Sequence, residues 1–437
     1  MSKRASIFTL GCRSNQYDGQ IIAQSLMDAG YEIVHFSEQA EIYVINTCTV
    51  THRGDSDSRK AVRNALRRNP DAFIIIAGCY PQWDCDTLQQ IKGIDLIIGN
   101  HEKLNITKYL PSDLKKHISP KVIVSDPTFD DAFGEKVAIP FEKSRALLKI
   151  QDGCDRSCSY CIVPHVRGKP RSLHGNKVLS RISELNSSGY KEIVITGINL
   201  GCWGRDIGDN LESLVESIET LVGDFRIRFS SIEPMELNSG FVNTILHSTR
   251  VSRHMHIPIQ SACGRILIEM GRPNTLKETG ELLEKIKSYD SSWNIGTDII
   301  IGYPGETEKD FEEELGNLSK LPIDYFHLFT YSPRKGTPAS EKSSKVSQAQ
   351  MKSRLETLKS LDKSRRLRFL ESQQGKIFTF ILEQQSTRKT DNIIGLSDNY
   401  IRAKIAGLPN ASGGVVTARI AEIVNRVPIA IPDDNNK

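Results

Sequence analysis

Three cysteines lie within eight residues near the middle of this 437-residue chain: Cys154, Cys158 and Cys161. One short loop with this spacing can hold three corners of an iron–sulfur cubane and leave the fourth iron free of protein. A zinc site is a second interpretation, but zinc sites usually collect four ligands from paired C-x2-C units, and the sequence has no second such pair. Disulfides are a third, but they belong to oxidising compartments, and the N-terminus lacks the apolar core of a secretion signal. We therefore interpret this stretch as an iron–sulfur loop.

The composition is that of a globular protein, with 38% hydrophobic and 25% charged residues. The length predicts about two to four domains. No run of 18 apolar residues occurs, so we expect a protein of the cytoplasm with no membrane contact. In that compartment nine cysteines indicate metal binding or catalysis. The net charge is only +4, so affinity for nucleic acid must come from local basic patches.

The N-terminal third predicts an open parallel sheet. Strand-like runs at 6–10, 42–45 and 73–77 alternate with helical stretches at 17–29 and 56–68. In such sheets ligands bind beyond the carboxyl ends of the strands. One cysteine follows the carboxyl end of each of the three strands: Cys12, Cys48 and Cys79. A single cysteine there is usually a small buried hydrophobe, but three at one relative position predict a second thiolate site.

The middle of the chain predicts a partial (β/α) barrel. Six strand-like runs separated by helices begin after residue 145, at 147–150, 192–197, 226–229, 254–259, 295–301 and 325–330. In barrels of this kind the chemistry gathers where the strands end.

The C-terminal region changes character. Residues 345–376 predict an amphipathic helix with a basic outer face, which is either a plain solvated surface or a contact for an RNA backbone. Residues 375–431 contain short β-rich runs separated by turn residues, and they predict a small antiparallel barrel.

Local motifs now carry a family resemblance. Residues 9–17 (TLGCRSNQY), 46–51 (NTCTVT) and 77–82 (AGCYPQ), with Tyr160 just before Cys161, resemble the radical S-adenosylmethionine (SAM) methylthiotransferases. The resemblance extends over essentially the whole chain. It implies an α/β protein with a methylthiotransferase N-terminal domain (1–138), a radical-SAM core with a partial (β/α)6 barrel (139–371) and a TRAM-like, OB-like RNA-binding domain (372–437). It also implies two [4Fe-4S] clusters, one held by Cys154, Cys158 and Cys161 with SAM on its open iron, and an auxiliary one held by Cys12, Cys48 and Cys79.

The same resemblance assigns a SAM site. Gly197 and Asn199 match the position where the family binds the amino group of SAM, and Arg272 lies in a segment resembling the family's M-x-R motif. A surface ion pair is the alternative for Arg272. The glycine-rich stretch 296–306 resembles a family motif more closely than it resembles an ordinary loop. The implied cofactor-binding residues are Tyr160, Gly197, Asn199, Ser231, Glu233, Gln260, Arg272 and Asp298.

Two groups of basic residues are candidate substrate contacts. Arg59, Arg63 and Arg67 share one helix face, which is either a solvated basic surface or a phosphate-binding stripe. Arg167, Lys169 and Arg171 follow the iron–sulfur loop and are expected to meet a substrate phosphate or the carboxylate of a modified base.

The family branch that this chain most resembles acts on N6-threonylcarbamoyladenosine (t6A) at position 37 of tRNA. We therefore expect a tRNA-modifying enzyme that inserts a methylthio group at C2 of that base. The same chemistry on isopentenyladenosine, or on an aspartate of a ribosomal protein, is an alternative. A non-catalytic iron–sulfur RNA-binding protein is an alternative of another class. We expect a monomer, and the sequence identifies neither the sulfur donor nor the electron donor.

Overall fold

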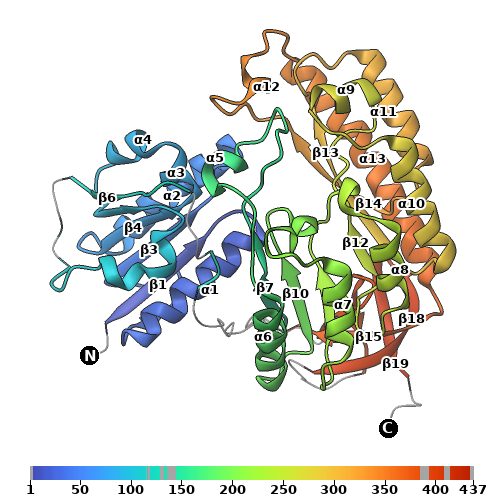
Figure 1. The fold of residues 1–437 in the computed structure, drawn as a ribbon, viewed down its shortest axis with the longest axis horizontal. Helices are drawn as coiled ribbons and strands as arrows, with labels where there is room; N and C mark the ends of the chain where they lie inside the picture. Colours follow the sequence, from blue (N-terminus) through green and yellow to red (C-terminus); the bar gives the residue numbers. More distant parts are fainter. Residues whose placement is uncertain are drawn as a thin grey trace.

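The computed structural model describes residues 3–114, 116, 119–127, 132–134, 144–383, 393–407 and 414–433. Three units follow one another along the chain: an N-terminal α/β domain, a central open barrel and a small C-terminal β-barrel (Figure 1). No helix in these described ranges is long and apolar enough to cross a membrane.

The first unit is a parallel sheet with strand order β2-β1-β3-β4-β5-β6. Its central strands β3 and β4 are buried on both faces, because α1 and the 3-10 helix η1 cover one face while α2 and α4 cover the other. The strand order reverses between β1 and β3, and ligands of doubly wound sheets bind at that switch point. The predicted sheet is thus confirmed, while η1 and β6 were not among the predicted elements. The elements are β1 (Arg4–Thr9), α1 (Arg13–Asp28), β2 (Glu32–Ile33), β3 (Ile42–Thr47), α2 (His52–Arg68), β4 (Phe73–Gly78), α3 (Cys79–Trp83), α4 (Cys85–Gln89), β5 (Leu96–Ile98), η1 (Glu102–Tyr109) and β6 (Lys121–Ile123).

The second unit is the predicted six-stranded partial barrel. Two parallel sheets, β7-β10-β11 and β12-β13-β14, are joined by parallel bridges between Ile227 and Val251 and between Ser231 and His256. Strands β7 and β14 form the two edges, and no pairing joins them in the part of the chain that the structure describes. The barrel strands are β7 (Ala146–Lys149), β10 (Glu192–Thr196), β11 (Arg226–Phe229), β12 (His254–His256), β13 (Asn294–Ile301) and β14 (Tyr325–Thr330). Two further strands, β8 (Gln151–Asp152) and β9 (Arg171–Ser172), form a separate antiparallel pair. The helices are α5 (Val163–Arg167), α6 (Gly175–Ser187), η2 (Leu200–Cys202), η3 (Arg205–Ile207), α7 (Leu211–Glu219), η4 (Pro234–Glu236), α8 (Ser239–His247), α9 (Gly264–Glu269), α10 (Leu276–Tyr289), α11 (Glu308–Lys320), α12 (Pro338–Glu341) and α13 (Gln348–Gln373).

The N-terminal domain spans the open side of this barrel. Beside β7, the Asp18 carboxylate of α1 lies 2.5 Å from the Lys149 ammonium. Beyond β14, the Arg334 guanidinium lies 2.7 Å from the Asp55 carboxylate of α2. These contacts hold the domain at both edges of the opening.

The third unit is a closed barrel with strand order β15-β16-β17-β19-β18. We predicted an antiparallel barrel, but β17 and β19 are parallel. A closed ring with an odd number of strands cannot alternate direction throughout, so one parallel pair is unavoidable. The strands are β15 (Ile377–Leu382), β16 (Ile393–Ser397), β17 (Arg402–Ile405), β18 (Val415–Val424) and β19 (Val427–Pro432).

Helix α13 leads into this barrel. The prediction that its basic residues form an outer face is only partly right. Its basic residues do not all face outward: Arg354 is buried against Glu306, Arg365 donates to the Leu318 carbonyl, and Arg366 donates to the Phe326 carbonyl. The predicted domain boundary at 371/372 falls in the last turn of this helix, and the one at 138/139 lies outside the described residues.

Candidate active site

The loop with Cys154, Cys158 and Cys161 begins where β8 ends. Gly153 has φ +76°, and a Cβ there would lie 2.0 Å from the Lys169 carbonyl oxygen, so only glycine fits. The Cys154 N–H donates to the Gly168 carbonyl at 2.9 Å, and the Ser159 N–H donates to the Met270 carbonyl at 3.0 Å. The loop is therefore held by backbone contacts on both sides, which leaves its thiols free for another ligand.

The chemistry of these thiols fits a metal cluster. Burial raises the pKa of Cys154 to about 11 and that of Cys161 to about 12, and it raises the pKa of Cys158 as well. Thiols in such surroundings stay protonated at neutral pH unless a metal displaces the proton. The donor set therefore suits a cluster held by three cysteines.

A cavity opens directly beside the three cysteines. It is lined by five of the eight predicted SAM-site residues, namely Tyr160, Asn199, Glu233, Gln260 and Arg272. We did not predict Arg156, Ile198 or Met235, which line it too. Ile198 stands between the predicted Gly197 and Asn199, and Met235 follows the predicted Glu233 by two residues. Their positions just after the ends of strands could therefore have identified them as residues that line the cavity.

Arg272 is a buried cation in this cavity, and not part of a surface ion pair. It is 4% exposed, pairs with Glu233 and donates to the Pro258 carbonyl at 2.6 Å. Burial raises the pKa of Glu233 although Arg272 opposes that effect. A guanidinium so placed can bind a carboxylate.

Asn199 also fits a bound cofactor. Its side-chain Nδ2 lies 2.9 Å from the Cys202 Sγ, while its buried Oδ1 has no hydrogen-bond partner. Buried polar atoms are normally paired, so this oxygen is suited to accept a hydrogen bond from an amine.

Three predicted residues lie outside the cavity lining. Gly197 lies next to the Gln151 side chain, and a Cβ at Gly197 would come within 2.9 Å of it. The Gln151 side-chain oxygen accepts a hydrogen bond from the Asn199 backbone N–H. Ser231 and Asp298 instead contact the His256 ring, at 2.8 and 3.2 Å.

The N-terminal cysteines meet at the switch point of the parallel sheet. Gly11 has φ +94°, and a Cβ there would lie 2.8 Å from the Cys48 Sγ, so the loops after β1 and β3 are in contact. Asn15 locks them together by donating to the carbonyls of Leu10 at 2.6 Å and Thr47 at 3.0 Å. Two of the predicted cysteines are therefore adjacent.

The third, Cys79, begins α3 after β4. Burial, together with the nearby Cys79 and Cys12 thiols, raises the pKa of Cys48 to about 12. Cys79 packs with Ile162 and Val166, which follow the iron–sulfur loop of the barrel. The two groups of cysteines therefore share one interface.

A cluster of buried charges stabilises that interface. Asp18 lies 2.7 Å from Lys103 and 3.0 Å from Arg167, and Asp152 lies 2.9 Å from Lys149 and 3.0 Å from Arg167. Arg167 is 2% exposed, and its charge opposes the effect of burial on the pKa of Cys12. We expected Arg167 to contact substrate, but its salt-bridge partners are internal.

The other candidate substrate residues lie on or near the surface. Arg63, Arg67 and Lys169 are exposed. Arg59 is half-buried and donates to the Tyr80 hydroxyl at 2.8 Å, and Arg171 donates to the Pro127 carbonyl at 3.0 Å.

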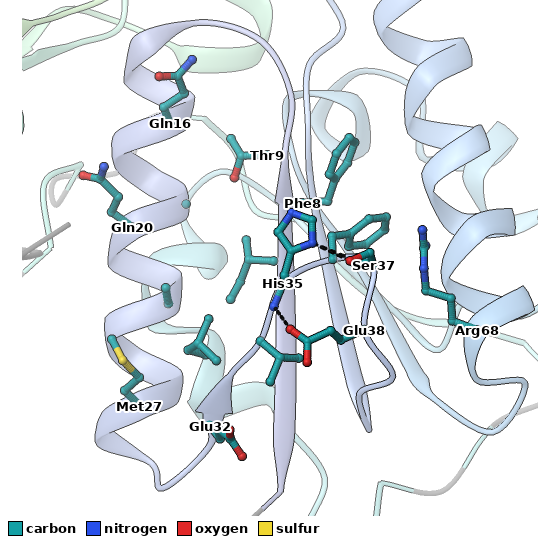
Figure 2. Close-up of a pocket in the computed structure, with 16 residues that line it drawn as sticks. Phe8, Thr9, Gln16, Gln20, Met27, Glu32, His35, Ser37, Glu38 and Arg68 are labelled. Atoms are coloured by element: carbon teal, nitrogen blue, oxygen red, sulfur yellow. Dashed lines mark hydrogen bonds between the residues drawn. The ribbon is translucent and has the colours of Figure 1, made fainter. Parts of the chain in front are cut away.

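A separate groove lies on the N-terminal domain. Figure 2 shows Gln16, Gln20 and Met27 of α1 on one side of it, and Phe8 and Arg68 farther across. No cysteine lines this groove, so it is distinct from both thiol sites.

Comparison with known proteins agrees with this geometry. Residues 148–317 match the radical SAM superfamily, and residues 4–99 match a family described as uncharacterized protein family UPF0004. A solved radical SAM methyltransferase, TsrM from Kitasatospora setae, shares the fold with a TM-score of 0.55 at 13% identity, over 78% of this chain and 77% of that one. Fold and cysteine loop thus define a radical-SAM protein, a class that holds a [4Fe-4S] cluster and SAM.

Relatives with similar sequences show which family of radical-SAM proteins this chain belongs to. The threonylcarbamoyladenosine tRNA methylthiotransferase MtaB of Aquifex aeolicus is 36% identical over 89% of this chain and 95% of its own length. The enzyme of the same name from Bacillus subtilis is 34% identical over 94% and 92%. A tRNA-2-methylthio-N(6)-dimethylallyladenosine synthase from Pelotomaculum thermopropionicum is 30% identical over 96% and 95%. The chain belongs to the radical-SAM methylthiotransferase family.

Proposed function

We propose that this protein adds a methylthio group to C2 of N6-threonylcarbamoyladenosine at position 37 of tRNA, with SAM as cosubstrate. The observation that carries the proposal is the packing of Cys79 with Ile162 and Val166, because it places the two cysteine groups at one domain interface. The identity to relatives named for this substrate supports the choice of base. A tRNA substrate also implies action in the cytoplasm, and we expect a monomer.

Each cysteine group has a separate role in this proposal. Cys154, Cys158 and Cys161 hold the cluster that binds SAM, while Cys12, Cys48 and Cys79 hold a second [4Fe-4S] cluster. With SAM, the first cluster supplies radical chemistry at a carbon that no side-chain base could deprotonate.

The remaining residues bind and orient. The unpaired Asn199 Oδ1 accepts a hydrogen bond from the SAM amine, and the Arg272 guanidinium receives its carboxylate. The N-terminal domain, held at both edges of the barrel opening, limits access of water to the reacting base.

Exposed cations and the C-terminal barrel would bind the tRNA. Arg63 and Arg67 on α2 and Lys169 after the iron–sulfur loop are available for phosphates. The target base must leave the anticodon stack to reach a site between two domains.

The test is a reconstituted reaction with three tRNA substrates, which carry t6A37, isopentenyladenosine 37 or unmodified adenosine 37. Digested nucleosides are analysed by mass spectrometry. We expect the methylthio product from the t6A substrate alone.

Product from the isopentenyladenosine substrate alone would move the assignment to the alternative base. SAM cleavage without a methylthio product from any tRNA would favour a protein substrate. Absence of SAM cleavage by the reduced, cluster-loaded protein would overturn the enzyme assignment.

A further inference from the structure

Three potential metal ligands, none of them a cysteine, converge on neighbouring strands of the barrel. His256 ends β12, Asp298 lies in β13 and His327 lies in β14. The strand register pairs Asp298 directly with His327. The ligand atoms of all three side chains lie within 4.8 Å of one another.

Two of the distances between these atoms are close to those around a tetrahedral ion. Asp298 Oδ1 lies 3.2 Å from His256 Nε2 and 3.3 Å from His327 Nδ1. Ligands about 2.0–2.1 Å from a tetrahedral zinc ion are about 3.3–3.4 Å apart. The carboxylate oxygen of Asp298 is therefore already at ligand distance from each histidine nitrogen, and an ion would draw the two imidazoles around it.

His256 provides independent support. The His256 residue is 7% exposed, and its buried Nε2 lies 3.2 Å from the Asp298 carboxylate without forming a well-aligned hydrogen bond. Its other ring nitrogen, Nδ1, lies 2.8 Å from the Ser231 hydroxyl. When Nδ1 donates to that hydroxyl, Nε2 presents the lone pair that a metal requires, as in histidine sites oriented by a second hydrogen bond.

The group formed by His256, Asp298 and His327 is accessible to solvent and close to the SAM cavity. The His327 side chain is 49% exposed and that of Asp298 is 22% exposed. Gln260, which lines the cavity, donates its backbone N–H to the Asp298 carbonyl at 2.9 Å. An ion bound here would face solvent on one side.

We propose that His256, Asp298 and His327 bind a divalent transition-metal ion. Two imidazoles and one carboxylate suit zinc or ferrous iron. Three protein ligands leave one coordination position open for water or for an oxygen donor of a substrate. Ser231 is a positioning residue, because it acts through His256.

The test uses Zn²⁺ as the probe and the full-length protein loaded with its iron–sulfur clusters, so that the cysteines are occupied. Zinc bound per chain is counted by elemental analysis after dialysis, and affinity is measured by calorimetry. We expect one zinc per chain, with zinc K-edge absorption showing only nitrogen and oxygen ligands at about 2.0–2.2 Å.

Variants locate the site. His327→Ala and Asp298→Asn should lose the bound zinc, while Ser231→Ala should keep it with affinity weakened roughly 10–100-fold. His247→Ala, at an exposed histidine of α8, is the matched control and should bind as the wild type does. Thermal unfolding of each variant confirms that it is folded.

Any of three results would overturn the proposal. The first is wild-type protein that binds no zinc, and the second is zinc binding that is unchanged in His327→Ala and Asp298→Asn. The third is sulfur coordination at about 2.3 Å, which would place the ion on cysteines.

Discussion

Individual cysteines divide the chemistry between two sites, and their substitution should separate two activities. Cys154→Ala should abolish SAM cleavage because it removes a ligand of the cluster that binds SAM. Cys48→Ala should leave SAM cleavage intact but stop methylthiolation. The measurements are 5′-deoxyadenosine released by the reduced protein and methylthio nucleoside formed in tRNA.

Cys85→Ala is the matched control, since Cys85 is half-buried on α4 and belongs to neither group. It should retain both activities. Methylthiolation by Cys48→Ala at the wild-type rate would refute the role of the second cysteine group.

At this scale the sequence indicated which cysteines lie together better than it predicted their surroundings. The spacing of Cys154, Cys158 and Cys161 is local, so it could be read directly. His256, Asp298 and His327 come from three strands, and only the strand register brings them together. The burial of Arg167 was also hidden, because Asp18 lies 149 positions away in the chain.

At the scale of elements, Glu192 of β10 connects the open barrel to the closed one. Its carboxylate pairs with Arg226 at 2.7 Å and with Arg228 at 2.8 Å. Those arginines donate to the carbonyls of Thr379 and Asp398 in the C-terminal barrel, at 2.7 and 3.0 Å. The ion group thus holds two domains together.

Glu192→Gln should destabilise the protein by about 3–5 kcal/mol, because it leaves buried guanidinium groups without a counter-charge. Urea unfolding followed by circular dichroism measures the loss. Glu216→Gln, at an exposed position of α7, should change stability little. Equal stability of the two variants would contradict this account of the domain contact.

Elements with strong hydrophobic runs were predicted well. Strands β3 and β4 are apolar throughout because both faces are buried, and their positions followed from composition alone. β6 was missed because Lys121 and Val122 are exposed at the sheet edge, where no burial pattern marks a strand. The parallel pair in the C-terminal barrel follows from ring closure, which no local pattern encodes.

At the scale of the whole molecule, Asp18 is the central anion between the N-terminal domain and the barrel. Burial alone would raise its pKa, but Lys103, Lys149 and Arg167 outweigh burial and lower it. Its stabilising contribution is therefore present above the unfolded-state pKa of about 3.9, and it is lost as the pH falls toward the folded-state value.

Asp18→Asn should cost about 3–5 kcal/mol at pH 7, because three buried cations lose a counter-charge. The difference from wild type should shrink below about pH 4, because Asp18 becomes protonated in the unfolded state while it stays ionised in the folded state. Urea unfolding at both pH values measures this. Asp57→Asn, at an exposed pair with Arg53, should cost less than about 1 kcal/mol. A pH-independent difference for Asp18→Asn would contradict the assigned charge state.

The central claim is that this protein methylthiolates t6A in tRNA, and nucleoside analysis tests it most directly. Total tRNA from cells with and without the gene is digested and quantified by mass spectrometry. We predict that deletion removes 2-methylthio-N6-threonylcarbamoyladenosine and that the precursor without the methylthio group accumulates. An unchanged nucleoside profile, in cells that lack a second enzyme of this family, would contradict the claim.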